Sequence, residues 1–362
     1  MAKDLKQIIA DEYVRCAKDP VHFMRKYCKI QHPTRGKINF DLYPFQEKSL
    51  LQFAAHDYSV ILKSRQLGIS TLTAGYTLWS MVFNQDFNAL VIAIKQDTAK
   101  NLVTKIRVMH EFLPSWLKGN ILEDNKLSLR LANGSQVKAI SSSPDAGRSE
   151  ALSLLVIDEA AFIDSIDTIW TSAQQTLATG GKCIALSTPN GVGNWFHKTW
   201  VKAEAGENKF NTIRLHWSVH PERSQEWRDD QDILLGVDQA AQECDCDFIS
   251  SGKSVVPGPL LEWYRDNMVQ EPVEKRGHDN SYWVWEYPNY TKNYIVVADV
   301  ARGDGGDYST FHVIDIETVT QVAEYKAHIG VKEFGNMLVN IATEYNEALL
   351  VIENANIGWA AI

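Results

Sequence analysis

Four short runs of apolar residues constrain the fold of this 362-residue chain more than any other feature. Each is rich in valine, isoleucine, leucine or alanine, as parallel strands that are buried on both faces usually are. The segments between them, 71–83, 97–113 and 164–178, have the apolar spacing that is typical of helices. The runs lie at 60–62, 89–93, 154–157 and 183–186. Strands that alternate with helices in this order predict an α/β fold with a mainly parallel sheet.

Signals for turns and loops divide the rest of the chain. In LSLRLANGSQVKAIS the pair Asn133-Gly134 separates two alternating runs, which predicts a β-hairpin. Residues 222–248 predict helices, and the passage 250–292, which is rich in glycine and proline, predicts a boundary. Strands are expected again at 294–298, 310–315, 321–325 and 349–352, with a helix at 331–345.

Composition excludes several classes of protein. Apolar residues make up 45% of the chain and charged residues 22%, which is typical of a globular protein. No run approaches the roughly 18 to 20 apolar residues that span a membrane, and the N-terminal segment is charged and amphipathic, unlike a signal peptide. The five cysteines form neither a disulfide framework nor a paired zinc motif. We therefore expect a soluble cytoplasmic protein.

The net charge of −9 argues against a nonspecific basic surface, although local patches can still meet nucleic acid. Lysine and arginine gather at 25–37 and at 95–107. Either cluster taken alone is more typical of a solvated face than of a DNA groove, so the sequence leaves open which of them contacts DNA.

The stretch VILKSRQLGISTL is similar to a phosphate-binding loop in which the lysine is displaced. An apolar strand enters a polar turn, and Gly68 is followed by Ser70, whose hydroxyl is suited to Mg²⁺, at the start of a helix. In the pattern G-x-x-x-x-G-K-[ST] the lysine would stand where Ile69 is. Lys63 is the expected replacement, because the β- and γ-phosphates need a positive charge within contact distance and not at a particular offset.

The run LLVIDEAAF predicts the second part of a nucleotide site. Its strand delivers Asp158 and Glu159 to the carboxyl edge of the sheet, where the first can hold Mg²⁺ and the second can orient or deprotonate a water molecule. The alternative is a buried strand followed by a helix N-terminus that favours acids. A phosphate loop about ninety residues upstream favours the nucleotide site.

Two further segments fit the same site. Gln46 in DLYPFQ has an amide that suits the edge of adenine, and Tyr43 or Phe45 can stack on the base, although Pro44 also favours a plain helix start. In LSTPNG, Ser187 and Thr188 leave a predicted strand at the same sheet edge, where hydroxyls can sense the γ-phosphate; a simple strand-to-turn exit is the alternative.

Six segments in this order resemble the large terminase subunit of tailed bacteriophages, an ATP-driven DNA-packaging motor with a C-terminal nuclease. No single segment is decisive, but their order is specific. They are YPFQ at 43–46, KSRQLGIST at 63–71, GRSEALSLLVIDEAAF at 147–162, LSTPNG at 186–191, AQECDCDFISSG at 241–252 and VVADVARGDGGDYST at 296–310.

The resemblance implies roles for the ATPase residues. Glu159 is expected to be the catalytic glutamate, with Lys63 as the displaced lysine and Arg148 as an arginine that acts on a neighbouring subunit's site. Arg65, acting within its own subunit, is the alternative to Arg148. The residues expected to contact ATP are Tyr43, Gln46, Lys63, Ser64, Arg65, Gln66, Leu67, Gly68, Ile69, Ser70, Thr71, Asp158, Ser187 and Thr188, with Ser70 and Asp158 holding Mg²⁺.

For the nuclease, the resemblance is to RNase H-like domains, in which carboxylates hold two Mg²⁺ or Mn²⁺ ions. Asp299, Asp307 and Glu353 are the expected metal ligands, whereas Asp304 is expected to be a turn residue. The third aspartate of the family is expected beyond residue 362, so the nuclease domain is expected to be truncated and its cleavage activity absent or incomplete.

These expectations give a RecA/ASCE-like P-loop ATPase with a helical lid and the beginning of an RNase H-like domain. The expected ranges are 1–220 for the ATPase core with its N-terminal helical segment, 221–270 for the lid, 271–292 for a linker and 293–362 for the partial nuclease.

The resemblance also implies what the protein meets in the cell. The expected partners are double-stranded DNA, the portal protein, the small terminase subunit and further copies of the chain in a ring on the portal, with no membrane, in the host cell cytoplasm. The alternative is a helicase or translocase of nucleic-acid repair, which would carry a second RecA-like domain after residue 290.

Overall fold

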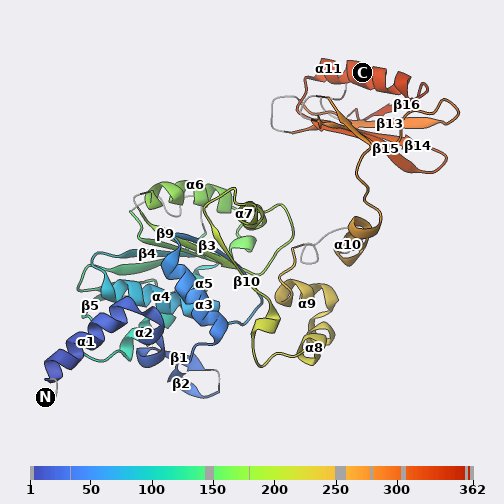
Figure 1. Cartoon of the computed structure of the whole chain (residues 1–362). Coiled ribbons are helices and arrows are strands. Elements are labelled where there is room, and N and C mark those ends of the chain that lie inside the picture. Colours follow the sequence, from blue (N-terminus) through green and yellow to red (C-terminus); the bar gives the residue numbers. More distant parts are fainter. Residues whose placement is uncertain are drawn as a thin grey trace. The chain divides into compact units, whose positions relative to one another are not determined.

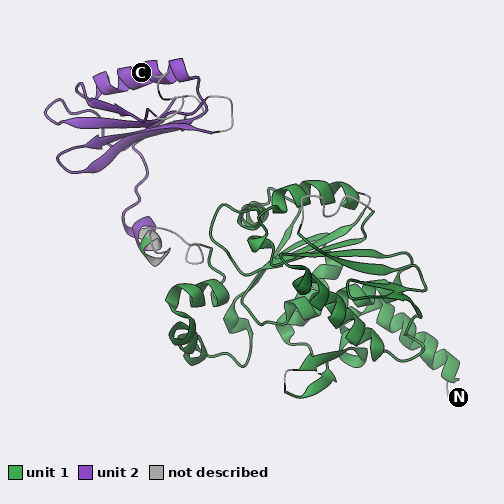
Figure 2. Cartoon of the chain, turned by 180° about the vertical axis from the view of Figure 1, so that it is seen from behind, with its two compact units in different colours: residues 1–262 green, residues 263–362 purple. Residues whose placement is uncertain are grey.

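The computed structural model describes residues 4–32, 34–142, 151–178, 180–248, 258–277, 280–302, 307–354 and 358. The chain divides into two compact units, residues 1–262 and 263–362, which are described separately (Figure 2). This division falls within the range expected for the lid, and the finer domain boundaries stay a prediction. Among the described helices, none is long and apolar enough to cross a membrane.

The first unit is built on an eight-stranded sheet with the strand order β10-β3-β9-β8-β4-β7-β6-β5. The four predicted apolar runs are confirmed as its adjacent central strands, and all four pair in parallel. They are β3 (Tyr58–Lys63), β9 (Lys182–Ser187), β8 (Leu154–Asp158) and β4 (Asn88–Ala93). Such strands lie in the middle of the sheet because both of their faces are buried.

Helices cover both faces of this sheet, and alternate residues of each strand point to opposite sides (Figure 1). Ile61 of β3 and Val156 of β8 pack in the core on the side of α4 (Ile69–Phe83) and α5 (Gln96–Glu111). Leu62 and Ile157 pack in a second core with α6 (Ile166–Leu177) and α7 (Trp195–Glu204). The predicted helices are confirmed with ends that differ by up to two residues.

The predicted hairpin is also confirmed, because β6 (Ser128–Leu131) and β7 (Gln136–Ser141) pair antiparallel around Asn133-Gly134. β7 then pairs in parallel with β4, so the hairpin extends the main sheet. β5 (Ile121–Asp124) follows as the edge strand.

Several elements lie outside the sequence prediction. β10 (Asn211–Leu215) pairs in parallel with β3 at the other edge of the sheet, although its residues show no strong apolar run. The N-terminal elements pack on the α4 side of the sheet. They are α1 (Leu5–Lys18), α2 (Pro20–Tyr27), β1 (Lys29–His32), β2 (Gly36–Asn39) and α3 (Pro44–Ala55).

Helices follow β10, as the sequence predicts. They are α8 (Gln225–Leu235) and α9 (Val237–Cys244).

The second unit holds a six-stranded mixed sheet with the order β11-β12-β15-β14-β13-β16. The predicted strands are confirmed: β13, β14 and β15 pair antiparallel, and β16 pairs in parallel with β13. The predicted helix α11 (Val331–Glu344) packs its apolar side chains on the core of this sheet. The strands are β11 (Glu274–Arg276), β12 (Tyr282–Val284), β13 (Tyr294–Asp299), β14 (Ser309–Asp315), β15 (Thr320–Ala327) and β16 (Leu349–Ile352). Helix α10 (Gly258–Asn267) spans the division between the units.

Candidate active site

The predicted phosphate loop lies between the end of β3 and the start of α4. Gly68, immediately before α4, has a φ of 72°, and Gln66 has a φ of 60°. A Cβ atom at Gly68 would lie 2.7 Å from the side-chain nitrogen of Gln46, so this position requires glycine on two grounds. Ile69, which replaces the usual lysine, is 1% exposed and belongs to the apolar core, so it packs inward as the first residue of the helix.

Lys63 reaches across the sheet edge to the acidic turn after β8. Its side chain is 7% exposed, and its Nζ lies 3.2 Å from Oε1 of Glu159. Glu159 has a left-handed φ of 56°, a conformation that is uncommon outside glycine. The displaced lysine and the predicted catalytic carboxylate are therefore in contact, although β9 separates their strands.

Asp158 and Ser70 form the second contact between the two motifs. The Ser70 hydroxyl donates to Oδ1 of Asp158 at 3.3 Å, and Asp158 is 6% exposed. Burial, and next the charge of Glu159, raise the pKa of Asp158, whereas Lys63, Lys105 and the Ser70 hydroxyl oppose that rise. A buried carboxylate beside a hydroxyl gives a set of hard oxygen atoms that is suited to a magnesium ion.

Gln46 is engaged within the protein. Its Oε1 accepts from the backbone N–H of Tyr43 at 3.1 Å, and its Nε2 donates to the carbonyl of Leu67 at 2.9 Å. It is 4% exposed, so it ties the start of α3 to the phosphate loop. Next to it, the ring of Tyr43 stacks on Phe45 at 5.7 Å and lies 4.6 Å from the ring of His220. An aromatic wall thus stands beside the loop.

The segment after β9 is tied to the turn that follows Glu159. The Ser187 hydroxyl accepts from the N–H of Ala161 at 3.2 Å, and the Asn190 amide donates to the carbonyl of Ala161 at 3.1 Å. Ser187 and Thr188 are buried. A movement of the turn after Glu159 would therefore change the hydrogen bonds of the segment after β9.

Two site residues were missed by sequence reasoning. Arg223 donates to Ser64 and to the backbone of Arg65, and Glu243 pairs with the Arg65 side chain at 3.1 Å. Glu243 lies in the AQECDCDF segment that carries the terminase resemblance, which was its only signal. No local pattern marks Arg223. Of the predicted residues, Arg148 lies outside the described part of the chain.

The acids of the second unit gather at one end of its sheet. Asp299 ends β13, and Glu353 follows the parallel neighbour β16, where its N–H donates to the carbonyl of Ala298 at 3.0 Å. Asp307 lies just before β14. The side chains of all three acids are exposed. Asp304 lies outside the described residues.

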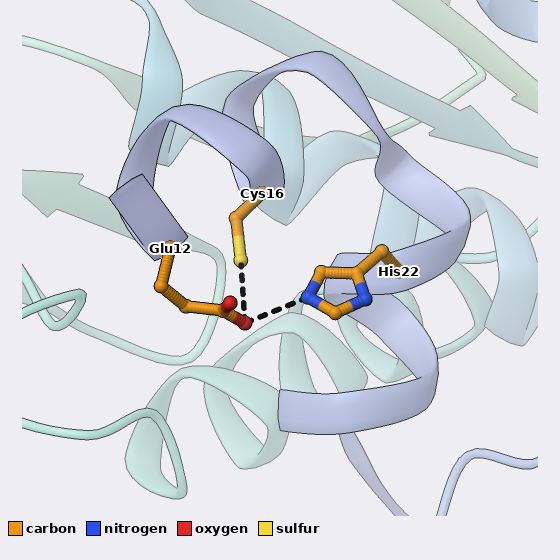
Figure 3. A group of neighbouring side chains, drawn as sticks. All are labelled: Glu12, Cys16 and His22. Atoms are coloured by element: carbon orange, nitrogen blue, oxygen red, sulfur yellow. Dashed lines mark hydrogen bonds and ion pairs between the residues drawn. The ribbon is translucent and has the colours of Figure 1, made fainter. Parts of the chain in front are cut away.

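A third group, Glu12, Cys16 and His22, joins α1 to α2 (Figure 3). Glu12 Oε1 lies 2.6 Å from Nε2 of His22 and also accepts from Lys26 at 2.8 Å and Tyr27 at 2.9 Å. The hydrogen bond from Lys26, followed by that from His22, lowers the pKa of Glu12 to about 2. Because an ammonium already occupies this carboxylate, the group acts as an interhelical hydrogen-bond centre and not as a cation site.

Comparison with known proteins relates this geometry to a family. Residues 60–262 match the model of the large terminase subunit, T4likevirus-type, N-terminal part. The large terminase subunits of Thermus phage G20c and Thermus virus P23-45 are each 29% identical over 192 residues, which is 48% of this chain. The match spans 36% of the length of each relative.

The fold agrees with a solved member of the same family. The crystal structure of the HK97 bacteriophage large terminase superposes with a TM-score of 0.54 at 14% identity, over 92% of this chain and 74% of that one. The family model covers more than half of the chain and includes the loop, the acidic turn and helices α8 and α9. The chain therefore belongs to the phage large terminase subunits.

Proposed function

We propose that this chain is an ATP-hydrolysing motor that moves double-stranded DNA into a procapsid. The observation that carries the proposal is the 3.2 Å contact of Lys63 with Glu159, made alongside the contact of Ser70 with Asp158. These contacts join the phosphate loop to the acidic turn after β8 at one edge of the sheet. The lysine comes from the start of the loop and not from the position of Ile69. A positive charge, a buried carboxylate and a second carboxylate are what phosphoryl transfer to water requires.

Each residue has a distinct task in this proposal. Lys63 leaves Glu159 for the β- and γ-phosphates, because a phosphate carries more charge than one carboxylate. Glu159, released from its ion pair, orients and deprotonates the attacking water. Ser70 and Asp158 would hold a magnesium ion, which when bound neutralises charge on the β- and γ-oxygens.

Adenine lies in this proposal against Tyr43 and the aromatic wall. Ser187 and Thr188 connect the acidic turn to the movement of the motor. Arg148 serves the site of a neighbouring copy in a ring on the portal protein, with Arg65 as its rival within the same subunit. If Arg148 acts between copies, the ATPase rate per chain rises steeply with protein concentration, and mixing Lys63→Ala with Arg148→Ala chains restores activity.

The second unit is proposed as part of a metal-dependent endonuclease for concatemeric DNA that includes residues 293–362. The linker expected at 271–292 instead supplies β11 and β12, which extend the same sheet from β15. Asp299 and Glu353 support it, because the ends of β13 and β16 are adjacent. Asp307 is the third proposed ligand of Mg²⁺ or Mn²⁺. The ATPase core is assigned to 1–220 and the lid to 221–270, and the small terminase subunit is a further proposed partner in the host cytoplasm.

The helicase alternative predicts a second parallel RecA-like sheet after residue 290. The sheet observed there is mixed, with antiparallel β13, β14 and β15. This topology favours the terminase function over the helicase.

The decisive test is Glu159→Gln, with Glu204→Gln on the exposed side of α7 as a matched control. We expect Glu159→Gln to bind ATP at least as tightly as the wild type, because Lys63 no longer leaves an ion pair, and to lose about 10²- to 10⁴-fold in hydrolysis rate, the range for a general base. Turnover that equals that of the control would remove the mechanism.

A further inference from the structure

The phosphate loop is held by the segment that carries α8 and α9. Arg223, just before α8, donates from Nη1 to the Ser64 hydroxyl at 3.1 Å and from Nη2 to the carbonyl of Arg65 at 2.9 Å. A guanidinium presents its donors in a rigid fork, so two contacts to consecutive residues fix both its position and the local path of the loop.

Arg223 is also fixed from the side of α8. Its guanidinium carbon lies 4.2 Å from the ring centroid of Trp227, one helical turn further along. A cation stacked on an indole ring is both attracted to the ring and limited in its rotamers. Arg223 is therefore a link with one end in α8 and the other in the phosphate loop.

Glu243, near the end of α9, provides a second link of a different kind. The N–H of Arg65 donates to the carbonyl of Glu243 at 2.7 Å, and the Arg65 guanidinium pairs with its carboxylate at 3.1 Å. The Glu243 side chain is only 16% exposed. One N–H, one hydroxyl and one cation of the loop are thus bound by acceptor atoms of Glu243, and phosphate oxygens could replace these acceptors.

The two links respond differently to an anion. Phosphate oxygens compete with Glu243 for Arg65, because both are acceptors for the same donors. Arg223 is itself a cation and a donor to Ser64 and Arg65, so an anion on the loop attracts Arg223 and does not repel it as it repels Glu243. An anion on the loop therefore loosens α9 while Arg223 keeps α8 attached.

We propose that Arg223 is a positioning residue that couples the phosphate loop to the lid helices α8 and α9, with Glu243 as the contact that a polyphosphate displaces. The identity of the displacing ligand, ATP or ADP, rests on the proposed function. Coupling of this kind needs a ligand that contacts the two states differently, which the exchange of Glu243 for phosphate supplies.

Hydrogen exchange measured without nucleotide first tests whether Arg223 holds the phosphate loop. We expect Arg223→Ala to speed exchange of the amides of residues 64–68 by about tenfold, a typical coupling factor, with Arg223→Lys in between because one amine replaces the fork. The matched control is Arg130→Ala, whose side chain is exposed on β6. Exchange at 64–68 that is equal in Arg223→Ala and the control overturns the proposal.

The second arm adds ADP to the same variants. In the wild type we expect ADP to speed exchange in residues 237–244 by about fivefold while residues 225–235 stay protected, and in Arg223→Ala we expect exchange in residues 225–235 to speed up as well. Glu243→Gln should bind ADP more tightly than the wild type, since its competitor for Arg65 is weaker. A lid response in Arg223→Ala equal to that of the wild type overturns the coupling. If the wild type binds no ADP, the proposed function fails. The nucleotide-free measurement still shows whether Arg223 holds the phosphate loop.

Discussion

The carboxylates of the two units end strands in similar ways but meet opposite surroundings. In the first unit Asp158 is 6% exposed, and Glu159 is in contact with a buried lysine. In the second unit Asp299 and Glu353 end adjacent strands and are exposed. The protein supplies positive charge to the first pair, and it leaves the second pair open to ions from solution.

This difference follows from what each proposed site receives. A nucleotide brings negative charge, so its site must hold cations, and a buried cation needs a partner while the nucleotide is absent. A two-metal nuclease receives cations, so its site must present carboxylates without competing lysines. The arrangement of charge therefore distinguishes the two sites before any ligand is bound.

The largest effect is expected from removing the lysine of the first unit. Lys63→Ala should lower the steady-state ATPase rate by about 10²-fold or more, because Lys63 is the buried cation beside the acidic turn, whereas Arg65 is 65% exposed and paired with Glu243. Lys126→Ala, an exposed lysine, is the matched control. If Lys63→Ala hydrolyses ATP normally, Arg65 or a neighbouring subunit supplies the charge, and the contrast between the two units is weaker than we state.

Glu12 is a carboxylate outside both sites that accepts hydrogen bonds from Lys26 and Tyr27. It provides a reference for how much such partners stabilise the fold. Glu12 has its pKa lowered to about 2 from 4.5, so it stabilises the fold above about pH 4.5, and this contribution is lost as the pH falls toward 2. Glu12→Gln should lower the free energy of unfolding by about 1 to 2 kcal/mol at pH 7, measured by urea denaturation. The difference from the wild type should shrink below pH 4.5; a difference that is constant with pH would contradict this account.

A smaller effect of opposite sign is expected at Asp158. Burial raises its pKa in the folded state, so the wild type loses stability as the pH rises above the ordinary value of 3.8. Asp158→Asn should therefore raise the melting temperature of the nucleotide-free protein at pH 7, and the gain should disappear in acid. A melting temperature below that of the wild type at pH 7 would show that the charge of Asp158 is stabilising.

The smallest effect on stability is expected in the second unit. Asp299→Asn should change the free energy of unfolding by less than about 0.5 kcal/mol, because the side chain is exposed. We expect MnCl₂ to raise the melting temperature of the wild type and of the control Asp229→Asn on α8, and not that of Asp299→Asn. A Mn²⁺ response that survives in Asp299→Asn would contradict the proposed metal site.

The central strands were predictable because each is a short apolar run between segments with helical spacing, a pattern that is visible in the local sequence. β10 was not, since its half-polar residues become a strand only where the free edge of β3 offers backbone partners. The same holds for the site. The displaced Lys63 was proposed from the loop alone, but Arg223 lies 158 positions from Arg65 and carries no local signal. The role of Arg148 stays a prediction, because it lies outside the described residues.

The sequence by itself determined the α/β class, the order of the nucleotide motifs and the family resemblance, because periodicity and motif spacing are local properties of a chain. Only the tertiary structure decided which strands are adjacent, that Lys63 contacts Glu159 across β9, and that Arg223 contacts the phosphate loop. These contacts join residues that are far apart in the sequence, and their free energy depends on burial and on partners that the chain acquires only when it folds.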